Sequence, residues 1–314
     1  MDYLKHWIPY DLKFVDGQWH CLWLAIGQHH LNEPFFDESI SLLKIKKGDN
    51  RYISTTGLEI LLFALEREAV PISCFIFHVS RCGSTLLSQA LSVNATNIVV
   101  PEAPIFDQIL RMREFDQSLS DDDLKNIFQK TVAWYGQNRT GEYQQYFIKL
   151  DSWHVHFYQQ LRFWYPKVPF YFLTREPFAI IKSHIKRRGI HTIPGYIQPI
   201  WLNIQLRDEH FRDFNYYTEL VIDGFYQKNI HVFNENDELN YFYDYGMGVE
   251  NMLYHFYSKV FNESRPSESS LLRLTKHSKH PEQTFSGDSE VVYEIKHSKL
   301  LENYHQLLKQ IKSL

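Results

Sequence analysis

The segment SRCGST, residues 80–85, has the residue types and the spacing of a phosphate-binding turn. It follows an apolar run and precedes LLSQAL, which reads as the start of a helix. Backbone N–H groups of such a turn, together with the positive end of the helix that follows, attract an anion. Gly83 allows the backbone to approach a ligand closely, and Arg81 supplies a forked cationic donor. Ser84 and Thr85 add hydroxyl groups, so the segment predicts an anion site.

The same turn also has a purely structural interpretation, in which Ser84 caps the helix and Arg81 lies on the surface. It is not the GxxxxGK[ST] turn of ATPases and GTPases, because no Lys precedes Ser84. An ordinary ATPase or GTPase would place that Lys on the terminal phosphates. The turn therefore favours a phosphate-bearing ligand other than a nucleoside triphosphate.

Charged residues follow three further segments that read as buried strands. They are Glu102 after NIVV, Lys149 and Asp151 at the end of QYFIKL, and Arg175 after VPFYFL. In parallel sheets, ligands bind at the carboxyl ends of the strands. We therefore expect these side chains and the turn at 80–85 to serve one site.

Two segments together resemble the sulfotransferases that use 3′-phosphoadenylyl sulfate (PAPS), in their bacterial P-loop form. SRCGSTLL resembles the family's 5′-phosphosulfate loop, in which Lys or Arg is followed by any residue, Gly and two hydroxyl residues. The family's second signature is an Arg at a strand end, with Pro two residues later and Ser eight residues later. YFLTREPFAIIKSH matches it with Arg175, Pro177 and Ser183. The resemblance covers residues 72–190 well and the remainder loosely.

The resemblance implies an enzyme that moves the sulfuryl group of PAPS to a hydroxyl or amine of an unidentified small-molecule acceptor, aromatic or carrier-bound acceptors included. In this family Arg81 would stabilise the oxygen that bridges sulfur and phosphorus. Arg175 and Ser183 would hold the 3′-phosphate. The residues expected to bind the donor are Arg81, Cys82, Gly83, Ser84, Thr85, Arg175 and Ser183.

In-line sulfuryl transfer needs a base for the acceptor proton, and two carboxylates compete for this role. Some family members place a catalytic Glu near the position of Glu102, which we favour. Asp151 stands where the cytosolic branch has a His, but it could equally cap the helix expected at Trp153. Lys149 would be a second cation near the transferring group.

One family element is absent: the RKGxxG sequence that cytosolic animal members carry near the C-terminus. Lys276, Ser278 and Lys279 occupy about the right part of the chain and are weak candidates for the nucleotide. Two alternatives to a sulfotransferase stay open. One is a P-loop small-molecule kinase or phosphotransferase, and the other is a catalytically inactive nucleotide-binding protein of the same fold.

Strands that alternate with helices of ten to fifteen residues predict an α/β fold, a P-loop NTPase-like three-layer sandwich. We expect a parallel sheet of about five strands flanked by helices, in a single domain that spans residues 1–314. Within it, residues 1–70 form an aromatic-rich extension and residues 72–190 the nucleotide-binding core. Residues 189–245, where the pattern loosens into Pro, Gly, Tyr and Trp, are expected to form a lid or acceptor region.

Composition excludes several other classes. The 33 basic and 37 acidic residues give a formal net charge of -4, which argues against a nucleic-acid partner. Three scattered Cys fit a reducing compartment, and the 16 His show no metal-ligand spacing, so we expect no metal. His78, inside the apolar run before the turn, is expected to pack in the core. The sequence has neither a signal peptide nor an apolar run of membrane-spanning length, so we expect a cytoplasmic protein without a membrane partner.

Overall fold

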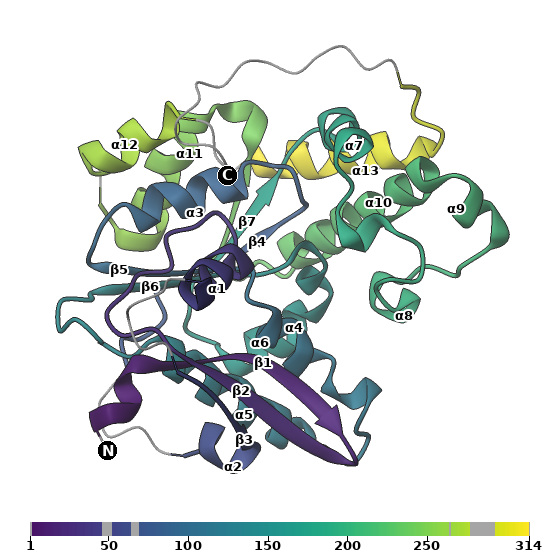
Figure 1. Ribbon diagram of the computed structural model, residues 1–314. Coiled ribbons are helices and arrows are strands. Elements are labelled where there is room, and N and C mark those ends of the chain that lie inside the picture. The colour runs from purple at the N-terminus through teal and green to yellow at the C-terminus, as the bar shows by residue number, and fades with distance from the viewer. Residues whose placement is uncertain (1, 46–51, 64–68, 264, 277–292, 314) are drawn as a thin grey trace. The chain divides into compact units, whose positions relative to one another are not determined.

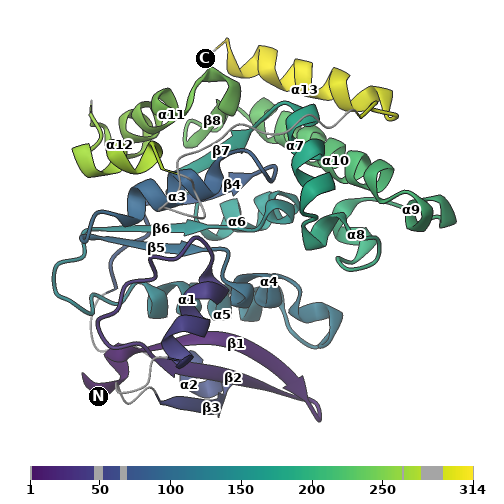
Figure 2. The ribbon, with the colours of Figure 1, turned by 45° about the horizontal axis from the view of Figure 1, so that its top comes forward.

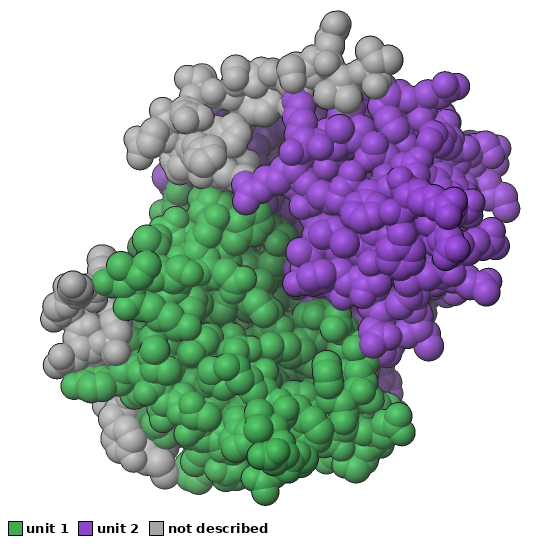
Figure 3. Space-filling view, turned by 45° about the vertical axis from the view of Figure 1, so that its right-hand side comes forward, with its two compact units in different colours: residues 1–75, 88–150 green, residues 76–87, 151–314 purple. Residues whose placement is uncertain are grey.

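A computed structural model describes the chain apart from residues 1, 46–51, 64–68, 264, 277–292 and 314. The described chain forms two compact units, coloured separately in Figure 3. Unit 1 comprises Met1–Phe75 and Ser88–Leu150, and unit 2 comprises Ile76–Leu87 and Asp151–Leu314.

The central sheet has five strands in the order β5-β6-β4-β7-β8 and is flanked by helices (Figure 1). In unit 1, β5 (Asn97–Pro101) pairs in parallel with β6 (Gln145–Lys149). In unit 2, β7 (Phe170–Thr174) pairs in parallel with β8 (Asn240–Asp244). Between them lies β4 (Cys74–His78). Every residue of β4, β5 and β7 is buried, as expected for strands covered on both faces. The predicted α/β fold class with a parallel five-stranded sheet is confirmed.

The aromatic-rich N-terminal segment is an antiparallel sheet of β1 (Trp7–Val15), β2 (Gln18–Ala25) and β3 (Ile53–Gly57). Its first hairpin turns at Asp16 and Gly17, which both have positive φ, as a two-residue turn between twisted strands requires. The segment packs into unit 1, because β1 contacts two helices of that unit, α4 and α5, whose bounds follow.

Local sequence signals mark the start of two core helices. Ser120 caps the long α5 through a reciprocal capping box with Asp123, and Pro177 is the first residue of α7. The α-helices up to this point are α1 (Phe36–Ile45), α2 (Leu58–Leu61), α3 (Ser84–Ser92), α4 (Pro104–Leu110), α5 (Asp121–Tyr135), α6 (Tyr158–Trp164) and α7 (Pro177–Lys186). Short 3-10 turns are η1 (Asp2–His6), η2 (Met112–Glu114), η3 (Ser152–Phe157) and η4 (Ile190–Thr192).

The segment 189–245, for which a lid or acceptor role stays a prediction, is largely helical. After α8 (Pro199–Leu202) and α9 (Asp208–Arg212) comes α10 (Phe214–Asn234), the longest helix of the described chain, and then β8. Aromatic, β-branched and Asn residues together with Gly224 give α10 a low intrinsic helix propensity. Its buried acids, among them Glu219 and Asp223, also interrupt the apolar period that would reveal it. Tertiary packing therefore decides this helix.

The C-terminal part of unit 2 completes the cover of β8. It contains η5 (Tyr245–Met247), α11 (Val249–Phe256), the π-helical turn η6 (Tyr257–Phe261), α12 (Glu268–Leu274) and α13 (Ser298–Ile311). Both α11 and α13 contact β8, and α13 also lies along α10 (Figure 2). None of the described helices is both long and apolar enough to cross a bilayer.

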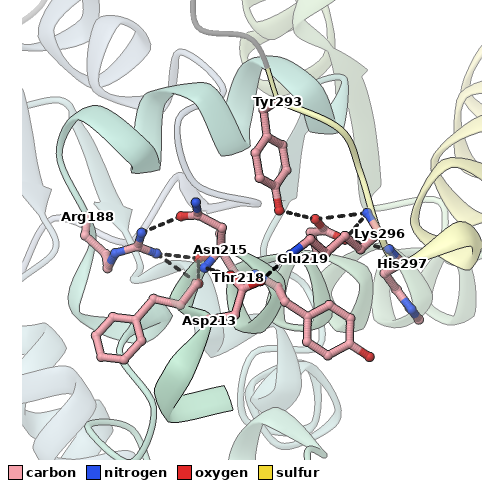
Figure 4. Close-up of polar contacts among 10 residues, drawn as sticks. Arg188, Asp213, Asn215, Thr218, Glu219, Tyr293, Lys296 and His297 are labelled. Carbon is pink, nitrogen blue, oxygen red and sulfur yellow. Dashed lines mark hydrogen bonds and ion pairs between the residues drawn. The ribbon is translucent and has the colours of Figure 1, made fainter. Parts of the chain in front are cut away.

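A buried carboxylate joins the segment before α13 to α10 (Figure 4). Glu219 of α10 is fully buried and accepts hydrogen bonds from the backbone N–H groups of Lys296, at 3.0 Å, and His297, at 2.6 Å. It also accepts one from the Tyr293 hydroxyl, and burial raises the pKa of that hydroxyl. Three donors offset the large cost of burying a charge, so Glu219 fixes the position of this segment.

We predict that unit 2 loses stability between pH 7 and pH 5 because of His255 on α11. Burial, with a smaller contribution from Lys259, lowers the pKa of His255 to about 4, and its Nδ1 lies 3.0 Å from the Tyr171 hydroxyl. The unfolded chain takes up a proton near pH 6.5 and the folded chain does not, so stability falls as the pH falls through this window. Urea unfolding at pH 7 and at pH 5 measures the free energy of unfolding. Its loss between these two pH values should be about 1–2 kcal/mol smaller in His255→Gln than in the native chain.

The control is His231→Gln, which changes a largely exposed histidine of α10 and should keep the native pH dependence. If His255→Gln loses as much stability as the native chain between pH 7 and pH 5, the assignment is wrong.

Candidate functional site

The order of the strands makes the carboxyl ends of β4 and β7 a candidate position for a ligand. These two strands are neighbours, but the chain leaves β4 toward one edge of the sheet and leaves β7 toward the other. Such a reversal opens a crevice at the carboxyl ends of the two strands. The backbone N–H of Val79, just after β4, bonds to the carbonyl of Leu173 at 3.1 Å, which joins these ends. The turn at 80–85 and Arg175 both start from this point.

The turn has an unusual backbone. Ser80, Arg81 and Gly83 have φ values of 70°, 49° and 84°, in the left-handed region that residues other than Gly avoid. Left-handed residues in a turn can direct successive N–H groups into a concavity that suits an anion. Because α3 begins directly at Ser84, its positive end faces the same place.

Gly83 is required by its surroundings as well as by its φ. A Cβ atom at this position would lie 2.5 Å from Cε2 and 2.6 Å from Cδ2 of Tyr245. No larger residue fits without moving this ring. The expectation that bare backbone is needed at Gly83 therefore has a second reason, a close aromatic neighbour that sequence reasoning missed.

Two arginines meet at the turn within unit 2. Nη1 of Arg175 donates a hydrogen bond to the carbonyl oxygen of Arg81 at 2.9 Å, and its guanidinium lies 4.7 Å from the centre of the Tyr245 ring. Nη2 of Arg81 donates to the carbonyl oxygen of Arg187 at 2.5 Å. The Tyr226 hydroxyl of α10 donates to the carbonyl oxygen of Arg175. Positive charge is thus gathered at the turn by contacts to the backbone.

Two histidines hold the turn in place, and sequence reasoning missed the second, His184. His78, at the end of β4, accepts a hydrogen bond from the N–H of Ser80 at 3.1 Å. His184 of α7 shares a hydrogen bond of 3.1 Å with the Ser80 hydroxyl and is buried. Its neighbour Ser183 is half-buried on the same helix, so α7 reaches the turn through His184.

The remaining residues of the turn differ in accessibility. Cys82 is fully buried, with its Sγ 3.5 Å from the carbonyl oxygen of Leu173, so it packs beneath the turn. Ser84 is buried at the start of α3, and Thr85 is half-buried. The contribution of Cys82 to a ligand is therefore limited to its backbone.

Glu102 and Lys149 form an ion pair within unit 1. Lys149 Nζ lies 2.8 Å from Glu102 Oε1, and the Lys149 side chain is fully buried while that of Glu102 is 19% exposed. The N–H of Glu102 also bonds to the carbonyl oxygen of Lys149 at 2.8 Å. Glu102 has φ 55°, a strained conformation for a residue with a side chain. A buried ammonium needs such a partner, so each residue fixes the other.

Asp151 belongs to unit 2 and precedes η3, where it is the N-cap residue. Its backbone N–H donates to His154 Nδ1 at 3.2 Å, and its carboxylate Oδ2 lies 3.9 Å from His154 Nε2. Asp151 therefore occupies the N-cap position of η3, and its role as a base stays a prediction. Within the units, the structure joins Arg81 to Arg175 and Glu102 to Lys149.

The C-terminal candidates for nucleotide binding gain little support from the structure. The backbone N–H of Lys276 bonds to the carbonyl oxygen of Arg273 just after α12, while Ser278 and Lys279 lie outside the described residues. Within the described ranges, no group of three or more His, Cys, Asp or Glu is arranged to hold a metal ion.

Comparison with known proteins adds a structural likeness. The chain is similar to a crystal structure of a sulfotransferase from Alicyclobacillus acidocaldarius, with TM-score 0.39 and 13% identity. The match covers 77% of this chain and 95% of that chain. No protein-family model matches the chain, and no curated protein matches its sequence. At this identity and TM-score, the likeness does not assign a function.

We predict that Gly83→Ala destabilises the chain by about 2–4 kcal/mol, the sum of left-handed strain and overpacking against Tyr245. Gly195→Ala is the matched control, because Gly195 has φ 80° but a Cβ there would meet only Leu206 Cδ1, at 3.9 Å. It should cost about 1 kcal/mol, from strain alone. Urea unfolding of the two variants measures the difference, and equal losses would show that Tyr245 does not confine the turn.

Proposed function

We propose that this protein is a sulfotransferase that takes the sulfuryl group from PAPS and transfers it to a hydroxyl or amine of a small-molecule acceptor. The observation that carries the proposal is the turn at 80–84 with Arg175 bonded to its backbone. A compact ligand with two separate phosphate positions needs two cationic groups that are held apart and fixed. Arg81 and Arg175 supply them from one crevice.

The donor would bind through its 5′-phosphosulfate at the turn. Backbone N–H groups of the turn, the start of α3 and the hydroxyls of Ser84 and Thr85 would contact its oxygens. Arg175 already uses one nitrogen on the Arg81 carbonyl, and the other nitrogens of its guanidinium would grip the 3′-phosphate together with Ser183. The backbone of Cys82 and Gly83 would complete the cradle.

The reaction would be an in-line displacement at sulfur. An acceptor oxygen or nitrogen forms a bond to sulfur as the bond from sulfur to the bridging oxygen breaks, and adenosine 3′,5′-bisphosphate leaves with that electron pair. Arg81 would stabilise the negative charge on the leaving oxygen. A carboxylate takes the acceptor proton. Positioning and electrostatics do most of the work in such transfers, as they do in phosphoryl transfer.

Glu102 is the better candidate for the base. Its contact with buried Lys149 fixes the carboxylate, and its strained φ of 55° is a cost that structures tend to keep where function needs it. Lys149 would then position Glu102 and add positive charge near the transferring group. Asp151 is the alternative, although its role as a helix cap already accounts for it. A phosphotransferase using ATP and Mg²⁺ is less well supported, because the cation of the turn is Arg rather than Lys.

We predict that Glu102→Gln lowers the turnover of PAPS by about 100-fold or more, because the acceptor proton loses its base. The measurement is release of radiolabelled sulfate from PAPS with water as acceptor. Glutamine can still accept a hydrogen bond from Lys149, so circular dichroism and bisphosphate affinity should stay within twofold of the native values. Asp151→Asn should keep most of the activity.

The matched control is Glu142→Gln, which removes an exposed carboxylate of unit 1 and should leave turnover unchanged. Loss of turnover in Asp151→Asn with activity kept in Glu102→Gln would reverse the assignment of the base. A native chain that does not turn over PAPS would contradict the proposed function itself.

A further inference from the structure

Unit 2 contains a cavity of about 520 Å³ that shares no residue with the turn at 80–85. One wall is a face of α10, and another comes from the segment around α8 and α9. His297, whose backbone N–H bonds to Glu219 of α10 (Figure 4), also lines the cavity, as does Lys299. The lining residues that matter for its chemistry are His156, Leu202, Ile204, Glu209, Tyr216, Leu220, Asp223, Lys228, His297 and Lys299.

The acids of the cavity are already partnered. Asp223, which is buried, accepts from His297 Nε2 at 2.9 Å and from Gln227 at 2.7 Å on one oxygen, and from Asn303 at 2.6 Å on the other. Glu209 lies 3.6 Å from Arg207, in an exposed ion pair at the rim. Asp223 thus has hydrogen bonds to both of its oxygens, and Glu209 lies beside a cation.

The two lysines of the cavity are not partnered in the same way. Neither Lys228 nor Lys299 has an ion pair or hydrogen bond with any described residue. Lys228 is half-buried, and burial lowers its pKa although the charge of Glu235 acts in the opposite direction, whereas Lys299 stands exposed at the rim. An ammonium that is drawn partly out of water without a direct ion pair favours the approach of an anion.

His156, beside Lys228, adds a second polar group that a ligand could contact. Its Nε2 is buried and has no hydrogen-bond partner in the described chain. Burial and then the charge of Lys228 lower the pKa of His156 to about 4, so the ring is neutral at pH 7. A neutral imidazole nitrogen can donate to, or accept from, a polar group of a ligand. A Cβ at Gly224 would lie 4.0 Å from this ring, so the helix leaves room around it.

Apolar side chains complete the wall. Leu202, Ile204, Leu220 and the ring of Tyr216 line the same cavity. Sites for small organic molecules combine such surfaces with a few polar groups that fix orientation, in volumes of about 300–1,000 Å³. An inorganic ion would use the two lysines but would leave these surfaces wet.

We propose that this cavity is a binding site for a small organic anion, a carboxylate or phosphate group on a carbon skeleton. Lys228 and Lys299 bind the acidic group, His156 bonds to a polar atom of the ligand, and the apolar wall covers the skeleton. The proposal is independent of the proposed function, because no residue of the donor site takes part.

Calorimetry with the full chain tests this site, using phenyl phosphate and benzoate as probes. Phenol removes the charge and keeps the ring, and inorganic phosphate keeps the charge and removes the ring. Each titration is run with and without saturating adenosine 3′,5′-bisphosphate, which keeps the turn at 80–85 from binding the probes. We expect phenyl phosphate or benzoate to bind with one-to-one stoichiometry in both conditions, and phenol and inorganic phosphate to bind at least tenfold more weakly.

The variants Lys228→Ala and Lys299→Ala should each lower the affinity for the anionic probe by about tenfold, as expected for the loss of a hydrogen bond to a charged group. Lys309→Ala removes an exposed lysine from the same helix as Lys299 and should change affinity less than twofold. The proposal is overturned if neither anionic probe binds, if phenol binds as tightly, or if Lys309→Ala weakens binding as much as the cavity variants. Failure of the bisphosphate to bind would count against the sulfotransferase alone.

Discussion

The structure depends on a short backbone segment held in a conformation that it would not adopt alone. Two residues with side chains, Ser80 and Arg81, have positive φ, which costs about 1–2 kcal/mol each. Three hydrogen bonds, in which the turn pairs with Arg175, His78 and His184, contribute about 1 kcal/mol each, which is of the same order as this strain. The strain is therefore carried by fixed neighbours, which is what a pre-formed anion site requires.

The same neighbours connect the turn to α10. The Tyr226 hydroxyl bonds to the carbonyl oxygen of Arg175. Arg188, next to the residue whose carbonyl holds Arg81, donates to Thr218 at 2.8 Å and to Asn215 at 2.6 Å. From there Glu219 fixes the segment that leads into α13. The helix α10 thus supports the turn at 80–85 and also forms a wall of the 520 Å³ cavity.

Much of this could be predicted from the sequence. The strand ends at Glu102, Lys149 and Arg175 could be predicted because buried parallel strands are continuous apolar runs. The start of α5 after Ser120 is also marked in the sequence, because capping depends on neighbouring residues alone. The helix α10 was not, since its stability comes from tertiary partners of Glu219 and Asp223 that lie about seventy residues or more away in the chain. For the same reason, nothing local marks His184 or Tyr245 as supports of the turn.

The proposed function rests on a site for a 3′-phosphorylated adenosine nucleotide at the turn 80–85 and Arg175. Calorimetry of the native chain with adenosine 3′,5′-bisphosphate, set against ATP with Mg²⁺, tests this site most directly. We expect tight one-to-one binding of the bisphosphate without added metal. Arg175→Ala should weaken the bisphosphate at least tenfold, a loss that adenosine 5′-phosphosulfate, which lacks the 3′-phosphate, does not share. Tighter binding of ATP with Mg²⁺, or equal losses for both ligands in Arg175→Ala, would contradict it.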